Sequence, residues 1–96
     1  MTVFHPGHDA LHGFTVVIFS NAGRTYAGRW DAVDGDVVWL NDAVHHDVAS
    51  SEVSEDAFLR RLAMFGPTPE HRRLAVPRTD VVDVRRLGDW IRSRET

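Results

Sequence analysis

The sequence predicts a small, mainly β domain in which five short, strongly bent strands form a barrel. It also predicts an α-helix inserted between the third and fourth strands and a short helical tail at the C-terminus. Two observations and one physical argument support this prediction. Short segments rich in β-branched and aromatic residues are typical of strands. Glycines separate the first three segments, as tight hairpin turns require. Closing such a sheet into a barrel removes its exposed edges.

The first two strands form a hairpin. Residues 14–20 are apolar and too short for a helix, and Gly23 follows them with the conformational freedom that a hairpin turn needs. The second strand is expected over residues 24–33. Gly28 in the middle of this strand indicates a sharp bend or a close approach of another backbone.

The third strand completes an antiparallel meander. Asp34 and Gly35 are a strong hairpin signal, and residues 36–44 again read as a strand. Because successive residues of a strand point to opposite faces, four residues of the second strand are expected on one face of the sheet. These are Tyr26, Gly28, Trp30 and Ala32.

Residues 45–71 are expected to be a helical insertion. Residues 45–54 are polar and predict a loop, after which Ser54 is an N-cap followed by acidic residues in the first turn. Gly66 and Pro67 end the helix. Its apolar face is expected to cover one opening of the barrel. That face consists of Phe58, Leu59, Leu62 and Phe65.

The last third of the chain predicts two more strands and a tail. The fourth strand covers residues 73–76 and is broken at Pro77, and the fifth covers residues 81–87. Gly88 is expected to end the fifth strand. Residues 89–94 then predict a short helix that buries Trp90 and Ile91.

Length and composition limit the class of protein. The 96 residues suit a single domain spanning 1–96, of which 1–13 form an N-terminal segment. All 11 basic residues are arginines, and against 14 acidic residues they give a net charge of −3. Residues 1–59 hold two arginines and nine acids, whereas residues 60–96 hold nine arginines and five acids. A basic C-terminal third on an acidic body can guide an anionic partner.

Several functions are excluded or disfavoured. Without cysteine there is no disulfide, thiol nucleophile or thiolate metal site. There is no nucleophile-elbow motif and no glycine-rich phosphate loop. We therefore expect a binding module without a cofactor, not an enzyme. No apolar run could cross a membrane, and the first residues lack the pattern of a secretory signal, so we expect a cytoplasmic protein.

Two stretches together resemble the Sm, LSm and Hfq superfamily of small SH3-like barrels. Residues 11–43 resemble its first signature, and residues 74–84 its second. The matching residues are Val16, Ile18, Gly23, Arg24, Tyr26, Gly28, Trp30, Asp34, Leu40, Asp42 and Ala43 in the first stretch, and Val76, Val81 and Val84 in the second. The resemblance implies a homo-oligomeric ring of about five to seven subunits, in which the fourth strand of one subunit pairs with the fifth of the next. It also implies single-stranded RNA as a partner.

The departures from the family pattern leave two functions open. The resemblance implies a nucleobase pocket that includes Asp34, but Val38 stands where an asparagine is expected. In the second signature, Pro77 and Arg78 replace an Arg-Gly pair. Arg78 could still contact a phosphate or stack on a base. One hypothesis is therefore RNA binding, and the alternative is a protein-interaction or assembly scaffold that has lost the base pocket.

Arginines and aromatic residues supply the candidate nucleic-acid surface. Together with Asp34, the candidate residues are Arg72, Arg73, Arg78, Arg85 and Arg86. Solvated strand edges explain these arginines equally well. The large aromatics Tyr26, Trp30 and Trp39 could form a stacking platform for bases, but packing in the core or at a subunit interface explains them better.

Two groups of histidines are weak metal candidates. His5, His8 and His12 have a spacing that could bind zinc or nickel if the segment were helical, although Pro6 favours a turn. His45 and His46 would point to opposite faces of a strand, so they could not share one metal ion without a bend. A solvated loop is the preferred interpretation of this pair.

Overall fold

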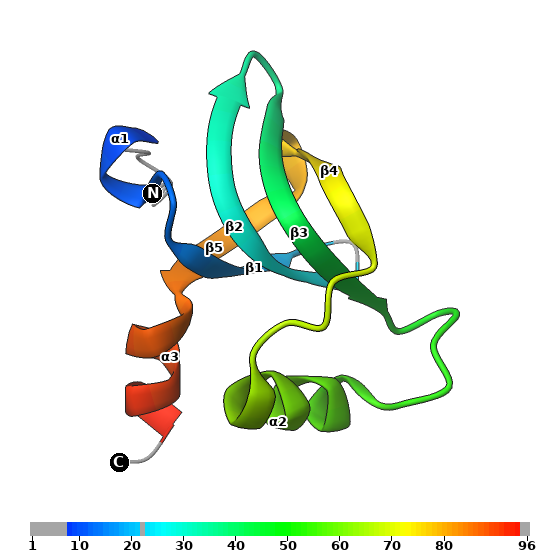
Figure 1. Cartoon of the computed structure of the whole chain (residues 1–96). Helices are drawn as coiled ribbons and strands as arrows, with labels where there is room; N and C mark the ends of the chain where they lie inside the picture. The colour runs from blue at the N-terminus through cyan, green and yellow to red at the C-terminus, as the bar shows by residue number, and fades with distance from the viewer. Residues whose placement is uncertain (1–7, 22, 95–96) are drawn as a thin grey trace.

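The computed structural model describes residues 8–21 and 23–94. They form one antiparallel five-stranded sheet in the order β4-β3-β2-β1-β5, with helices at both ends and between β3 and β4 (Figure 1). The strands are β1 (Thr15–Ser20), β2 (Arg24–Asp34), β3 (Val37–Asp47), β4 (His71–Pro77) and β5 (Val81–Arg86). The helices are α1 (His8–Leu11), α2 (Glu55–Phe65) and α3 (Leu87–Arg94), and the 3-10 turn η1 (Arg78–Asp80) joins β4 to β5. The mainly β fold with an inserted helix and a C-terminal helix is therefore confirmed.

The inner face of the bent sheet carries the main core. All five strands contribute apolar side chains to it, and Leu11 of α1 packs against the same cluster. Burying this surface supplies most of the folding free energy of such a small domain. The buried members are Val16, Ile18, Tyr26, Trp30, Val38, Leu40, Ala43 and Val76.

Irregular pairing bends β2 against β3. The register shifts between Ala27 and Arg29 and again between Trp30 and Ala32. At the first shift, a Cβ on Gly28 would lie 2.8 Å from the Cβ of Ala43, which confirms the predicted close approach. The second shift pairs Ala32 with Trp39, whereas Val33 packs on the inner core. The period-two prediction for Ala32 was wrong because a bulge exchanges the faces of the residues that follow it.

The third strand is longer than the sequence predicts. His45 and His46 pair with Tyr26 and Thr25 of β2, so they belong to β3 and not to a loop. The connection to β4 therefore covers residues 48–70 rather than 45–71. Local polarity suggested a loop here, but a strand continues as long as its partner offers backbone groups to pair with.

The caps of α2 are those predicted. The Ser54 hydroxyl accepts a hydrogen bond from the Ala57 amide, and the Gly66 amide donates to the Leu62 carbonyl with φ +76° at Gly66. Thr25, which is buried, donates from its hydroxyl to Glu55 at 2.7 Å. This bond ties the first turn of α2 to β2.

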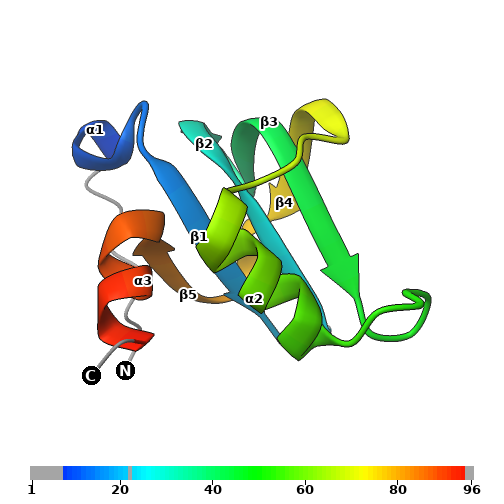
Figure 2. The ribbon, with the colours of Figure 1, turned by 60° about the horizontal axis from the view of Figure 1, so that its bottom comes forward.

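The sequence predicts that α2 covers an opening of the barrel, and this prediction is wrong. The helix packs beside α3 on the outer face of the sheet, as Figure 2 shows. The buried residues of this outer cluster are Val17, Ala27, Val44, Leu62 and Trp90. Phe65 was expected in the buried face, but 73% of it is exposed. Helical spacing identifies an apolar face, yet it cannot show how far the surface beneath extends.

The C-terminal segment turns into a helix earlier than predicted. Gly88 does not end a strand but lies in the first turn of α3, which begins at Leu87. Trp90 packs against Phe19 with ring centroids 6.4 Å apart, so burial of a large aromatic holds the helix on the sheet. None of the helices in the described ranges 8–21 and 23–94 has the length and apolar character that a membrane span requires.

Candidate functional site

The structure brings Asp34 and Arg78 to the same end of the barrel. Asp34 ends β2 at the β2–β3 hairpin, and Arg78 begins η1. The Arg78 amide donates to the Asp36 carbonyl at 2.7 Å, and its Nη1 lies 3.4 Å from the Gly35 carbonyl oxygen. Pairing of Val37 with Pro77 aligns the two segments. A strand end far along the chain is thus held against the hairpin turn.

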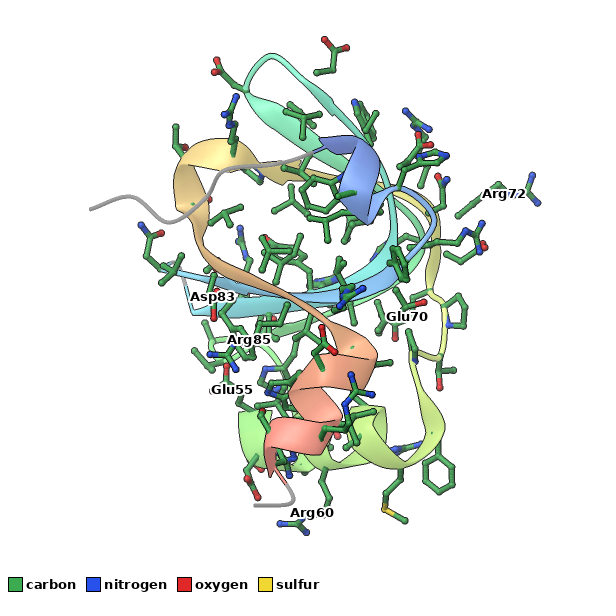
Figure 3. All side chains as sticks on the ribbon, turned by 90° about the vertical axis from the view of Figure 1, so that its left-hand side faces the viewer. Glu55, Arg60, Glu70, Arg72, Asp83 and Arg85 are labelled. Atoms are coloured by element: carbon green, nitrogen blue, oxygen red, sulfur yellow. The ribbon has the colours of Figure 1, made fainter. Side chains whose placement is uncertain are left out.

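Arg72 and Arg73 lie on β4, at one edge of the sheet. The Arg73 guanidinium stacks over the ring of Trp39 at 4.4 Å and pairs with the Asp31 carboxylate at 2.8 Å. Arg72 points to the other face of the strand, and Figure 3 shows its side chain extending away from the barrel.

Arg85 and Arg86 lie on β5, at the opposite edge of the sheet. Arg85 pairs with Asp83 at 3.0 Å, and Arg86 pairs with Asp89 at 2.8 Å. Figure 3 shows Arg85 and Asp83 on the side of the molecule away from Arg72. Within one chain these four arginines therefore form two groups, one at each edge of the sheet, and Arg78 lies apart from both at the end of the barrel. Arg73, Arg85 and Arg86 each pair with an aspartate.

The three large aromatics of the sheet differ in exposure. Trp30 and Tyr26 belong to the inner core and are only 1% and 4% exposed, so their rings pack in the core and cannot stack on a base. Trp39 lies on the outer side of the same sheet and is half-buried beneath Arg73. Of the three, only Trp39 presents a ring from which a base could be reached without unfolding the core.

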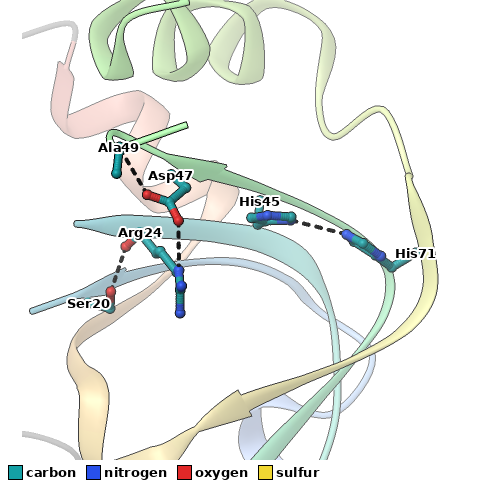
Figure 4. Close-up of polar contacts among 6 residues, drawn as sticks. All are labelled: Ser20, Arg24, His45, Asp47, Ala49 and His71. Carbon is teal, nitrogen blue, oxygen red and sulfur yellow. Dashed lines mark hydrogen bonds and ion pairs between the residues drawn. The ribbon is translucent and has the colours of Figure 1, made fainter. Parts of the chain in front are cut away.

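The histidines of β3 are not solvated loop residues. His46 is 3% exposed, packs against Phe58 and has its Nε2 2.8 Å from the Val53 carbonyl oxygen. His45 is on the inner face of the strand, where its Nδ1 lies 3.1 Å from the Nε2 of His71 (Figure 4). Neither His71 nor the neighbouring Glu70 carried a sequence signal, because only the pairing of β3 with β4 brings them to His45.

The N-terminal histidines remain a sequence-based hypothesis. His5 and the side chain of His8 lie outside the described residues. The Nδ1 of His12 is 2.8 Å from the Asp31 carbonyl oxygen, a contact that ties the segment before β1 to β2.

An ion pair holds the opposite end of the β2–β3 ladder (Figure 4). The Ala49 amide donates to Asp47, and together with the guanidinium of Arg24 at 3.0 Å it lowers the pKa of that carboxyl below its usual range. The same carboxylate raises the pKa of Arg24. The Ser20 hydroxyl donates to the Arg24 carbonyl and joins β1 to this end of the sheet.

Comparison of the sequence with protein-family models and with curated proteins finds no match. Solved structures do match. The Sm protein of Pyrococcus abyssii, in complex with a uridine heptamer, aligns with a TM-score of 0.56 and 14% identity over 86% of this chain and 99% of that one. The SmAP (LSm) protein of Methanococcus vannielii aligns with a TM-score of 0.52 and 18% identity over 88% and 97% of the two chains.

The chain has the Sm fold. A chain from the NatC complex bound to CoA is also similar, with a TM-score of 0.51 and 16% identity over 100% of both chains. The low identities make this a divergent example of the Sm fold, in agreement with the resemblance read from the two signatures.

The structure shows where the departures in the two signatures lie. Val38, in place of the expected asparagine, is fully buried in β3 opposite Val76 of β4. The side chain at this position therefore packs in the core and offers no amide group for binding a base. Pro77, in place of the expected arginine, ends β4, and Arg78 follows it at the start of η1. The guanidinium thus remains next to the hairpin although the order of residues has changed.

Proposed function

We propose that the chain is a non-enzymatic Sm-fold module that assembles into a ring and binds single-stranded RNA at the end of the barrel formed by the β2–β3 hairpin and η1. The contacts of Arg78 with Gly35 and Asp36 carry this proposal. They keep a guanidinium and the Asp34 carboxylate at one end of the barrel, where donors and acceptors for a base and a phosphate would lie together.

The two edges of the sheet favour a ring, for which the Sm resemblance implies about five to seven copies. The sheet order leaves β4 and β5 as its outermost strands, and their outer backbone groups can pair with another strand. Pairing β4 of one copy with β5 of the next satisfies both edges. It also places Arg72 and Arg73 of one copy near Arg85 of the neighbour, which reunites the two groups of arginines.

A substitution at Val82 tests the ring. Val82 is an apolar residue of the edge strand β5, and its side chain is half exposed in a single chain. We expect light scattering on a size-exclusion column to give the mass of a ring for the wild type and that of one chain for Val82→Glu, since a charge blocks edge pairing. Val48→Glu, at an exposed valine away from both edges, is the control and should keep the ring. A monomeric wild-type protein would contradict the proposal.

A substitution at Arg78 tests RNA binding. We expect fluorescence anisotropy to show binding of short U-rich or A-rich RNA that weakens as salt is raised. Arg78→Ala should lower the affinity about tenfold, because a guanidinium that contacts nucleic acid is worth roughly 1–3 kcal/mol. Arg60→Ala removes the same charge from the exposed face of α2, far from the hairpin, and should change the affinity little. Absence of binding at low salt would refute this function.

A protein scaffold is the second candidate function. Ion pairs of Arg73, Arg85 and Arg86 with aspartates and the net charge of −3 reduce attraction to a polyanion. The similar chain from the NatC complex gives a precedent for this fold within a protein assembly. A partner protein recovered after nuclease treatment, together with no RNA binding by the purified ring, would favour the scaffold over the RNA-binding module.

A further inference from the structure

We propose that His45, Glu70 and His71 bind a divalent transition-metal ion, with Zn²⁺ as the ion that fits best. One ligand atom from each of the three side chains lies within 4.8 Å of the others. Within this group, the Nδ1 of His45 is 3.1 Å from the Nε2 of His71, and Figure 4 shows the two rings pointing toward one another. This site depends neither on the ring nor on RNA binding.

Backbone pairing, not side-chain flexibility, brings the three residues together. His71 is the first residue of β4 and pairs with Ala43, so His45 lies diagonally from it on the same face of the sheet. The Glu70 amide donates to the Ala43 carbonyl at 2.9 Å, which fixes the residue before the strand. The ring of Tyr26 lies 6.3 Å from that of His45 and supports it from the β2 side.

The distances suit a tetrahedral zinc ion. With Zn–N bonds of about 2.0–2.1 Å, two nitrogens on one ion lie about 3.3 Å apart. The two imidazole nitrogens need to separate by only a few tenths of an ångström to reach that geometry. Glu70 is exposed, so its carboxylate can rotate inward as the third ligand. Two imidazoles and one carboxylate leave a fourth position for water, the donor set of open zinc sites.

A hydrogen bond between the two imidazoles is the competing explanation of the 3.1 Å contact. Such a bond needs a proton on one nitrogen, whereas a metal ion needs both nitrogens unprotonated. Zinc binding must therefore displace that proton from between the rings, to the other nitrogen of the same imidazole or to solvent, and the carboxylate of Glu70 should matter to affinity. The hydrogen bond alone requires neither a metal nor Glu70.

Zinc at this position would join β3 to the first residue of the edge strand β4. A ligand that binds only the folded chain raises its stability by mass action. At a free Zn²⁺ concentration about 100-fold above the dissociation constant, we expect the melting temperature to rise by about 10–20 °C. The same addition should leave the melting temperature of a chain without His71 unchanged.

The test uses the full chain without a tag, carrying His5→Ala, His8→Ala and His12→Ala so that the N-terminal histidines cannot bind metal. Calorimetric titration with ZnCl₂ alone should give one ion per chain. Adding His71→Ala should abolish stoichiometric binding, and Glu70→Gln should weaken it about tenfold or more. Glu52→Gln, at an exposed acid outside the group, is the matched control and should bind like the parent.

Nuclear magnetic resonance of the histidine rings provides the second readout. In the parent chain, Zn²⁺ should shift the ring signals of His45 and His71 but not those of the buried His46. The proposal is overturned if the parent binds no stoichiometric zinc, or if His71→Ala and Glu70→Gln bind as tightly as the parent. His71 and Glu70 lie outside both cores, so these variants should fold, which circular dichroism would verify. If His71→Ala nevertheless fails to fold, the zinc affinity of Glu70→Gln and the shifts of the histidine ring signals still test whether these residues bind the ion.

Discussion

Replacing Gly28 with alanine is expected to lower the free energy of unfolding by about 2–3 kcal/mol. The new Cβ would lie 2.8 Å from the Cβ and 3.0 Å from the Cα of Ala43, and 3.1 Å from the Asn41 carbonyl oxygen. Two of these atoms belong to the backbone of β3, so no side chain can rotate to make room. Separating β2 from β3 would disturb the register on which the inner core depends.

Urea denaturation followed by tryptophan fluorescence measures this effect. The control is the same change at Gly88, where a Cβ would meet only the flexible end of Arg92 at 3.7 Å. Gly88 lies in α3, so Gly88→Ala should leave stability unchanged or raise it by up to about 1 kcal/mol. Equal stability of the wild type and Gly28→Ala would show that the two strands do not approach as closely as described.

Trp30→Ala should destabilise the domain by about 3–5 kcal/mol, the usual cost of removing a large aromatic from a core. Trp30 is 1% exposed and belongs to the core cluster to which all five strands contribute. A domain of this size has only about 5–10 kcal/mol of stability, so the variant should lose a large part of it and melt at a temperature at least about 10 °C lower than the wild type.

Trp39→Ala is the matched comparison. Its ring is half-buried on the other face of the sheet and is covered by the Arg73 guanidinium. We expect a loss of only about 1 kcal/mol from the lost stacking and partial burial. Thermal denaturation monitored by circular dichroism measures both variants. Similar losses for the two tryptophans would contradict their placement on different faces.

The elements with strong local signals agree with the structure. Ser54 and Gly66 cap α2 as predicted, because a cap depends on residues within one helical turn. Gly23 and Gly35 both have positive φ in the hairpin turns. Each of these features is determined by interactions between residues close together in the sequence.

The errors concern features that depend on a distant partner. The loop predicted at His45 and His46 is strand because β2 extends far enough to pair with it. Ala32 changed face because of a bulge between two strands. Phe65 has the spacing of a buried residue but lies exposed at the end of α2. Each of these outcomes is decided by where another segment lies, which local patterns do not record.

The residues of the candidate sites also fall into those that the sequence indicated and those that only the structure brought together. Arg78 was selected for its place in the second signature, and the structure holds it beside the hairpin of Asp34. Nothing local indicated that Arg85 would be at the opposite edge of the sheet from Arg72. The group of His45, Glu70 and His71 had no signal, because its members are joined only through β3–β4 pairing.

The sequence by itself determined the strands of the meander, both caps of the inserted helix, the turn glycines and the Sm resemblance. These depend on residue type and on spacing within a few positions. The tertiary structure alone decided the strand ends, the bulges, the face on which α2 packs and the clustering of the histidines. The physical reason is that backbone hydrogen bonds between strands and burial in a shared core are gained only when distant segments meet. Those gains outweigh the local preferences of individual residues.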